Sequence, residues 1–162
     1  MLLQGRRGEA LPLLLKGLNA FRATGARVRV PYYLGMLGDA YTQAGRFEDA
    51  LQAFNEALAI AERNDDRFQE AELHRLKGEL HLAKSNDQAA AEGCFRTAIE
   101  TARRQQSRAW ELRATTSLAR LWQRQGRRDE ARAALAAVYD TFTEGFTTPD
   151  LVEARALLDS LS

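Results

Sequence analysis

Small and bulky residues recur in this chain at an interval of about 40 residues. One column contains only alanine, at steps of 40, 41 and 40 residues: Ala10, Ala50, Ala91 and Ala131. A bulky column follows at the same steps: Leu14, Phe54, Phe95 and Leu135. A third column is small again: Gly38, Gly78 and Ala119. Self-similarity at a fixed period of this length indicates stacked structural repeats, so it constrains the fold more than any single motif does.

Residues 31–63 show what one repeat contains. Two antiparallel helices approach closely only where their side chains are small, so Gly38 and Ala50 are expected to mark the contact between them. Phe54 and its bulky neighbours would fill the space around that contact. The pattern predicts a helix ending near Ala44, a turn at Gly45 and a second helix from Arg46 to about Arg63. One such hairpin could belong to an ordinary bundle, but its recurrence favours an array.

This order of residues resembles the tetratricopeptide repeat (TPR), which has a bulky residue, Leu-Gly and Tyr, then Ala, Phe and Ala at set offsets. Leu34 stands where the family usually has Trp, and Glu62 where it often has Pro. The period exceeds the usual 34 residues, which predicts helices longer by about six residues per repeat. The resemblance implies an all-α fold: a TPR-like alpha solenoid of antiparallel helical hairpins with a C-terminal capping helix.

We expect residues 1–162 to form a single array: a half repeat (1–25), three repeats (28–66, 68–106 and 107–143) and a capping helix (148–161). Asp65 or Asp66 is expected to cap the second repeat, Ser107 the third and Thr148 the final helix. The second repeat lacks a turn glycine and has Lys77 and His81 in the Leu and Tyr columns, so looser packing is expected there.

The half repeat carries an apolar stripe on a helix predicted from about Gly8 to Arg22: Leu11, Leu14, Leu15, Leu18 and Phe21. A solenoid helix is normally covered on both sides, and here one covering helix is missing from the sequence. An exposed stripe of this kind usually marks an interface. We therefore expect either more chain before Met1 or a homo-oligomer formed through this end. The capping helix predicts that the array ends near the last residue.

Composition excludes several classes of function. The net charge of +1 argues against a generic nucleic-acid or membrane-surface binder. A single cysteine, Cys94, allows no internal disulfide, and a buried inert thiol is expected. The chain has no apolar run of about 18 residues and no signal-peptide pattern, so a cytoplasmic protein is expected.

The sequence predicts no catalytic residue, metal site or cofactor, and hence no enzyme. His74 and His81 are the only histidines, and seven residues on one helix separate them by about 10.5 Å, too far to share a metal. Glu70 lies one turn before His74, but a solvated helix face explains this pair better than a two-ligand site. No Ser/His/Asp or Cys/His arrangement is apparent.

The resemblance to TPR proteins implies a concave groove lined by the first helix of each repeat. The family's ligand-facing positions fall on these residues of the three repeats: Tyr32, Asp39, Gln43, Glu72, Arg75, Glu79, Arg113, Arg120 and Arg124. The Lys and Asn pairs with which chaperone-binding relatives clamp a peptide carboxylate are missing. The resemblance thus implies a non-enzymatic protein–protein interaction scaffold that binds a peptide or protein segment.

Charge divides along the chain. Residues 39–72 carry 3 basic and 9 acidic groups, whereas residues 96–132 carry 10 and 4, so the groove is expected to begin acidic and end basic. Arg113, Arg120 and Arg124 share one helical face, which suits an acidic peptide or a phosphate. A merely solvated basic face, head-to-tail pairing of subunits and nucleic-acid binding through the Arg-rich third repeat remain alternatives.

Residues 70–161 are also similar to the C-terminal TPR region of large bacterial signalling regulators of the predicted-ATPase and adenylate-cyclase type. This similarity implies a sensor or docking array that belongs to a signalling or transcription-regulating protein. The chain has no GxxxxGK[ST] stretch, so no ATPase or cyclase chemistry is inferred for it.

Overall fold

The computed structural model describes residues 7–25, 29–65 and 67–162, and these contain eight α-helices, a single 3₁₀ turn and no strand. The elements are α1 (Arg7–Ala23), α2 (Val30–Gln43), α3 (Phe47–Arg63), η1 (Arg67–Gln69), α4 (Glu70–Ser85), α5 (Gln88–Arg104), α6 (Arg108–Arg124), α7 (Arg128–Tyr139) and α8 (Pro149–Ser160). The predicted all-α solenoid is confirmed.

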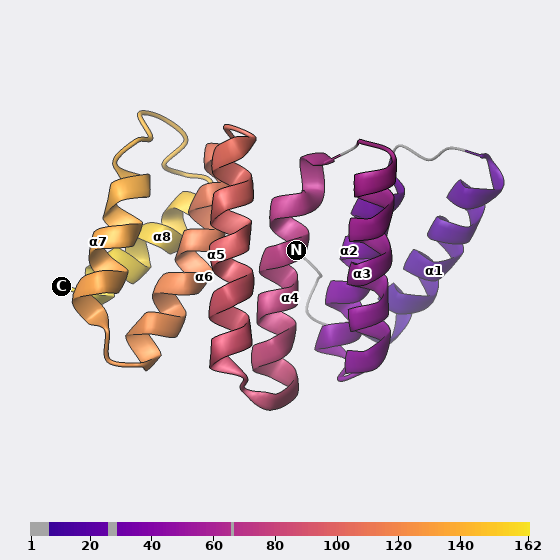
Figure 1. The fold of residues 1–162 in the computed structure, drawn as a ribbon, viewed down its shortest axis with the longest axis horizontal. Coiled ribbons are helices and arrows are strands. Elements are labelled where there is room, and N and C mark those ends of the chain that lie inside the picture. Colours follow the sequence, from indigo (N-terminus) through magenta and orange to yellow (C-terminus); the bar gives the residue numbers. More distant parts are fainter. Residues whose placement is uncertain (1–6, 26–28, 66) are drawn as a thin grey trace.

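The helices stack side by side in chain order, from α1 at one end of the molecule to α7 and α8 at the other (Figure 1). Consecutive helices form the hairpins α2–α3, α4–α5 and α6–α7, and α8 packs against both α6 and α7. The first helices of the hairpins also contact one another, α2 with α4 and α4 with α6. Residues at equivalent positions of these three helices are therefore brought onto one surface.

A phenylalanine ring over a glycine holds each of the first two hairpins together. A Cβ atom placed on Gly38 would lie 2.5 Å from Cε1 of Phe54, and one placed on Gly78 would lie 2.4 Å from Cε1 of Phe95. Both rings are fully buried. The second hairpin therefore packs as closely as the first, and the expectation of looser packing there was wrong: the glycine and phenylalanine columns are intact and outweigh the changes at Lys77 and His81.

The turns follow the prediction in position but not always in residue type. Gly45 and Gly126 adopt the positive φ angles of 72° and 78° after α2 and α6. In the second repeat Asn86 takes this role with φ 50°, which asparagine tolerates better than most residues. Asp87 then caps α5 by accepting a hydrogen bond of 3.0 Å from the backbone N–H of Ala90.

The starts of three helices differ in detail from the expected caps. Asp65 does not cap α4, because it adopts a left-handed conformation (φ 52°) and the turn η1 intervenes before α4 begins at Glu70. Asp66 lies outside the described residues. Ser107 and Thr148 do stand at the N-cap positions of α6 and α8, but neither side chain makes a capping hydrogen bond.

Apolar side chains gather in two cores, one built from α1 to α4 and the other from α5 to α8. In the apolar stripe of α1, Leu18 is only 2% exposed. Its other members, Leu11, Leu14, Leu15 and Phe21, are half-buried and pack against the first core. Within the described residues the stripe is thus partly covered, and the large apolar residue that α1 leaves to solvent is Leu13, 66% exposed.

Replacing Gly78 by alanine is expected to lower the free energy of unfolding by about 1–3 kcal/mol, because the new methyl group would overlap the buried Phe95 ring. Gly93 provides a matched control in α5, since a Cβ there meets no atom within 4 Å. Gly93→Ala should raise stability by about 0.5–1 kcal/mol through helix propensity. Urea unfolding of both variants measures this difference, and equal midpoints would contradict the proposed contact.

Candidate functional site: a groove along the first helices

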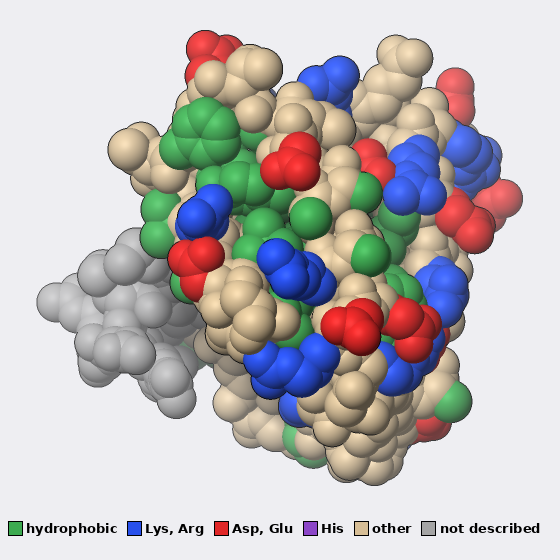
Figure 2. Space-filling view, turned by 90° about the vertical axis from the view of Figure 1, so that its left-hand side faces the viewer, with side chains coloured by type: hydrophobic (Ala, Val, Ile, Leu, Met, Phe, Trp, Pro, Cys, Tyr) green, Lys and Arg blue, Asp and Glu red, His purple; other side chains and the backbone are tan. Residues whose placement is uncertain are grey.

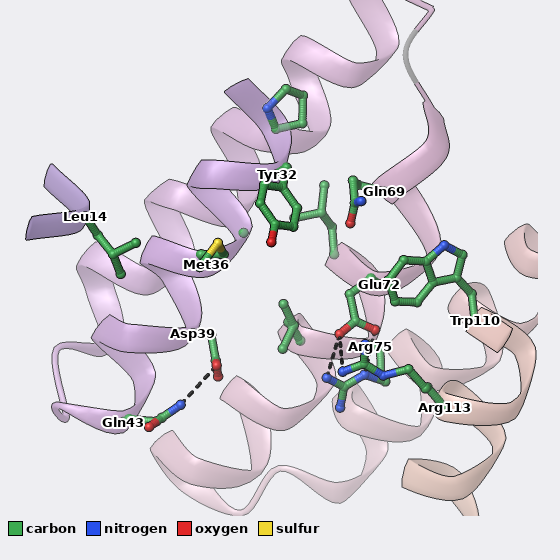
Figure 3. Close-up of a pocket in the computed structure, with 14 residues that line it drawn as sticks. Leu14, Tyr32, Met36, Asp39, Gln43, Gln69, Glu72, Arg75, Trp110 and Arg113 are labelled. Atoms are coloured by element: carbon green, nitrogen blue, oxygen red, sulfur yellow. Dashed lines mark hydrogen bonds and ion pairs between the residues drawn. The ribbon is translucent and has the colours of Figure 1, made fainter. Parts of the chain in front are cut away.

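A hollow of about 430 Å³ lies between α2, α4 and α6 (Figure 3). Six of the nine residues predicted to face a ligand line it: Tyr32, Asp39, Gln43, Glu72, Arg75 and Arg113. We call this the first hollow. The remaining three, Glu79, Arg120 and Arg124, line a second hollow of about 340 Å³ further along the array. A narrow cleft lined by Arg75, Arg113 and Arg120 lies between them, so the predicted positions of three repeats border one groove.

The first hollow has an apolar wall that the sequence analysis did not anticipate. Met36 lies one turn after Tyr32 on α2, and Trp110 stands near the start of α6 on the opposite side (Figure 3). Tyr32 is 43% and Met36 38% exposed. The i, i+4 spacing of Tyr32 and Met36 was a usable signal, because residues four apart on a helix share a face. Trp110 could have been found in the same way, three residues before Arg113.

Glu72 is the centre of an ion-pair network beside the first hollow. Its carboxylate accepts two hydrogen bonds from Arg75, of 2.8 Å from Nε and 2.9 Å from Nη2. Nη2 of Arg113 on α6 lies 2.9 Å from the same carboxylate. The side chains of Glu72 and Arg75 are only 11% and 13% exposed. Two guanidinium groups from adjacent repeats therefore share one nearly buried carboxylate.

The network continues along the groove. Arg75 also lies 3.4 Å from Glu79, which accepts a hydrogen bond of 2.7 Å from the hydroxyl of Ser117 on α6. Burial disfavours the charged form of Arg75, but the hydrogen bond and charge of Glu72, followed by the charge of Glu79, raise its pKa above the usual value. Arg75 thus stays a permanent cation at the junction of α4 and α6.

Helix α8 supplies carboxylates to the arginines of α6. Asp150 lies 3.7 Å from Arg113, and Glu153 pairs with Arg120. Within the part of the chain that the structure describes, only Arg124 among the three predicted groove arginines has no ion-pair partner. The expectation of three free arginines is therefore corrected, because their charges are largely neutralised by acidic residues of the adjacent helices.

The histidines and the cysteine show no arrangement for chemistry. Burial is the main cause that lowers the pKa of His74, which favours its neutral form, and burial likewise raises the pKa of the Cys94 thiol. Over residues 7–25, 29–65 and 67–162 no group of three His, Cys, Asp or Glu side chains could hold a metal ion. None of the helices described is both long enough and apolar enough to cross a membrane.

Comparison with known families matches most of the chain. Two family models, each described as tetratricopeptide repeat, match residues 1–63 and 32–104, and residues 112–143. The chain belongs to the tetratricopeptide repeat family. TPR proteins generally mediate protein–protein interactions and are typically non-enzymatic scaffolds.

A curated relative is also similar. An uncharacterized protein of Rhizobium meliloti (strain 1021) is 32% identical to this TPR chain over 105 residues, which cover 65% of the chain and 10% of the relative. The chain therefore matches about a tenth of the length of that protein.

Removing the shared carboxylate should destabilise the fold. Glu72→Gln is expected to cost about 3 kcal/mol, because two partly buried guanidinium groups lose their main counter-charge. Asp159→Asn removes an exposed pair with Arg155, whose side chains are 63% and 62% exposed, and should change stability by less than about 0.5 kcal/mol. Urea unfolding measures both, and a Glu72→Gln cost no larger than that of the control would refute this role.

Proposed function

We propose that this TPR array is a non-enzymatic scaffold whose groove binds a peptide or protein segment. The observation that carries the proposal is the shared surface: ligand positions assigned separately in three repeats border one continuous groove. Because α2, α4 and α6 contact one another, an extended segment lying across them would meet side chains of all three repeats.

The array would serve as the sensor or docking region of a larger signalling or transcription-regulating protein in the cytoplasm. Two observations support this assignment: residues 70–161 resemble the TPR region of bacterial predicted-ATPase and cyclase-type regulators, and the chain matches only a tenth of a much longer relative. The partner segment would then come from another protein or from another domain of the same polypeptide. Repeats at 28–66, 68–106 and 107–143 would each contribute one first helix to the groove.

The second hollow is where an acidic group of the partner would bind. Arg124 is exposed there, at the end of α6, and has no ion-pair partner in the described part of the chain. An arginine free of internal pairing can form bidentate hydrogen bonds with a partner carboxylate. Gln123 and Arg120 lie beside it in the same hollow. This contact is the part of the groove that supports a partly acidic partner.

Nucleic-acid binding through the third repeat is less well supported. Several arginines of this region are paired within the protein, such as Arg103 with Glu111, and Arg127 with both Glu92 and Glu130. On the end of the array that carries α7 and α8, basic and acidic side chains lie next to one another (Figure 2). Nucleic-acid binders instead present a basic stripe that neutralises phosphates.

Self-association through α1 is a separate proposal. The stripe formed by Leu11, Leu14, Leu15, Leu18 and Phe21 packs partly on the first core, and its half-buried members together with the exposed Leu13 would form the contact. Light scattering at high protein concentration should show a mass above that of one chain, and a monomer would remove this proposal.

A photo-crosslinking residue in the groove should capture the partner. We expect p-benzoylphenylalanine in place of Met36, in cells that produce the full-length protein, to cross-link reproducibly to one protein segment, because Met36 is exposed in the first hollow. The same residue in place of Ala133, exposed on α7, serves as the control. Mass spectrometry identifies the linked peptide.

Two results would contradict the proposed function. Identical cross-links from positions 36 and 133 would show that the groove has no selectivity. Cross-links to RNA or DNA rather than to protein would favour the nucleic-acid alternative.

A further inference from the structure

We propose that the first hollow receives a large apolar side chain of the partner segment, and that Asp39 binds a lysine or arginine next to it. This inference rests on the proposed function and adds the chemistry of the ligand at one place in the groove. It differs from the sequence-based expectation of an acidic partner, which concerns the arginine-lined end.

The mouth of the first hollow is unusually apolar for an exposed surface. Of the exposed large apolar residues in the described chain, Tyr32 and Met36 line the hollow, and Phe68, 66% exposed, stands beside it in η1. Phe68 meets the ring of Trp110 edge-on at 6.1 Å, so the apolar surface continues from the wall of the hollow outwards. Exposed apolar side chains that gather around a concavity mark binding sites more often than scattered ones do.

The floor of the hollow is also apolar and is kept open by a glycine. Leu73 and Leu76 of α4 contribute to the lining, opposite Gly35 of α2. A Cβ atom on Gly35 would lie 3.0 Å from Cδ2 of Leu73, so a larger side chain at this position would crowd the floor. A volume of about 430 Å³ is at the lower end of ligand sites and is large enough for one bulky side chain and part of its neighbour.

Charge around the first hollow favours a cation. Two guanidinium groups, those of Arg75 and Arg113, are surrounded by four carboxylates: Asp39, Glu72, Glu79 and Asp150. Asp39 accepts a hydrogen bond of 3.0 Å from Gln43 and takes part in no ion pair within the described residues. In Figure 3 it lies at the same side of the hollow as Met36. A partner cation would supply the missing counter-charge.

An acidic side chain would find less to bind here. Arg75 already has both a bidentate contact with Glu72 and a contact with Glu79. To bind Arg75, a partner carboxylate would have to displace the nearly buried side chain of Glu72. Desolvating a second carboxylate at a site that already has an excess of negative charge is unfavourable.

Selection from a random 12-residue peptide library displayed on phage, against the full chain, tests the inference without assuming a sequence. We expect the enriched peptides to share a Trp, Phe, Leu or Met within three positions of a Lys or Arg. The best synthetic peptide, with its aromatic residue replaced by Leu if it contains Trp, should then shift the indole N–H signal of Trp110 in a nitrogen–proton NMR spectrum. The signal of Trp122, buried in the second core, should not move.

The variants assign the cation to Asp39. Asp39→Asn should weaken the best peptide about tenfold and leave a version with its basic residue replaced by Gln unchanged. Asp129→Asn, the same change on an exposed site of α7, should have no effect on either peptide. Equal affinities of wild type and Asp39→Asn for the basic peptide would overturn the role of Asp39.

The outcomes separate this inference from the proposed function. Peptides that shift Trp110 but contain an acidic residue, or no charge, beside the apolar one would overturn the charge assignment and leave the groove as a binding site. Enriched peptides that move neither Trp110 nor any residue of α2, α4 and α6 would overturn both. Basic apolar peptides that depend on Asp39 would establish the inference.

Discussion

The architecture depends on the contact between a phenylalanine ring and a glycine of the preceding helix. At Gly38 and at Gly78 the ring lies where a Cβ atom would be, so the two helices of the hairpin come closer than any larger residue would permit. The same contact occurs 40 and 41 residues apart, and α2 and α4 consequently take equivalent positions in the array. In the third hairpin Ala119 and the buried Leu135 occupy the same columns. Because the hairpins repeat this geometry, equivalent residues of the first helices face one groove.

The ion-pair network beside the groove follows from this stacking. Glu72 and Arg113 occupy the same column of successive repeats, 41 residues apart, and they meet because α4 and α6 are neighbours. Buried ion pairs contribute little net stability compared with apolar packing, but breaking one is costly, so they penalise any other register of the two helices. The network thus holds two repeats and α8 in place. It also uses up the arginine charge that would otherwise be available to an anion, and this shapes what the first hollow can bind.

Much of the fold could be predicted from the sequence because its signals are local or periodic. The glycine and phenylalanine columns, the turn glycines Gly45 and Gly126 and the proline-marked start of α8 depend on neighbours in the chain or on the repeat interval. What could not be predicted involves choices between similar local solutions. Asn86 replaces a turn glycine, and Asp65 turns the chain instead of capping α4. The pairing of Glu72 with Arg113 could have been inferred by comparing charges within one column, whereas the apolar mouth of the first hollow depends on how η1 presents Phe68 to Trp110.

The most direct test of this account is the footprint of a bound segment on the helices. Amide hydrogen exchange of the full chain, with and without the partner segment identified by cross-linking, would map the residues that become protected. The account predicts slower exchange in α2, α4 and α6, which line the groove, and little change in α3, α5 and α7. Protection concentrated in α3, α5 and α7, with the first helices unchanged, would show that the array binds through its other face and would contradict the central claim.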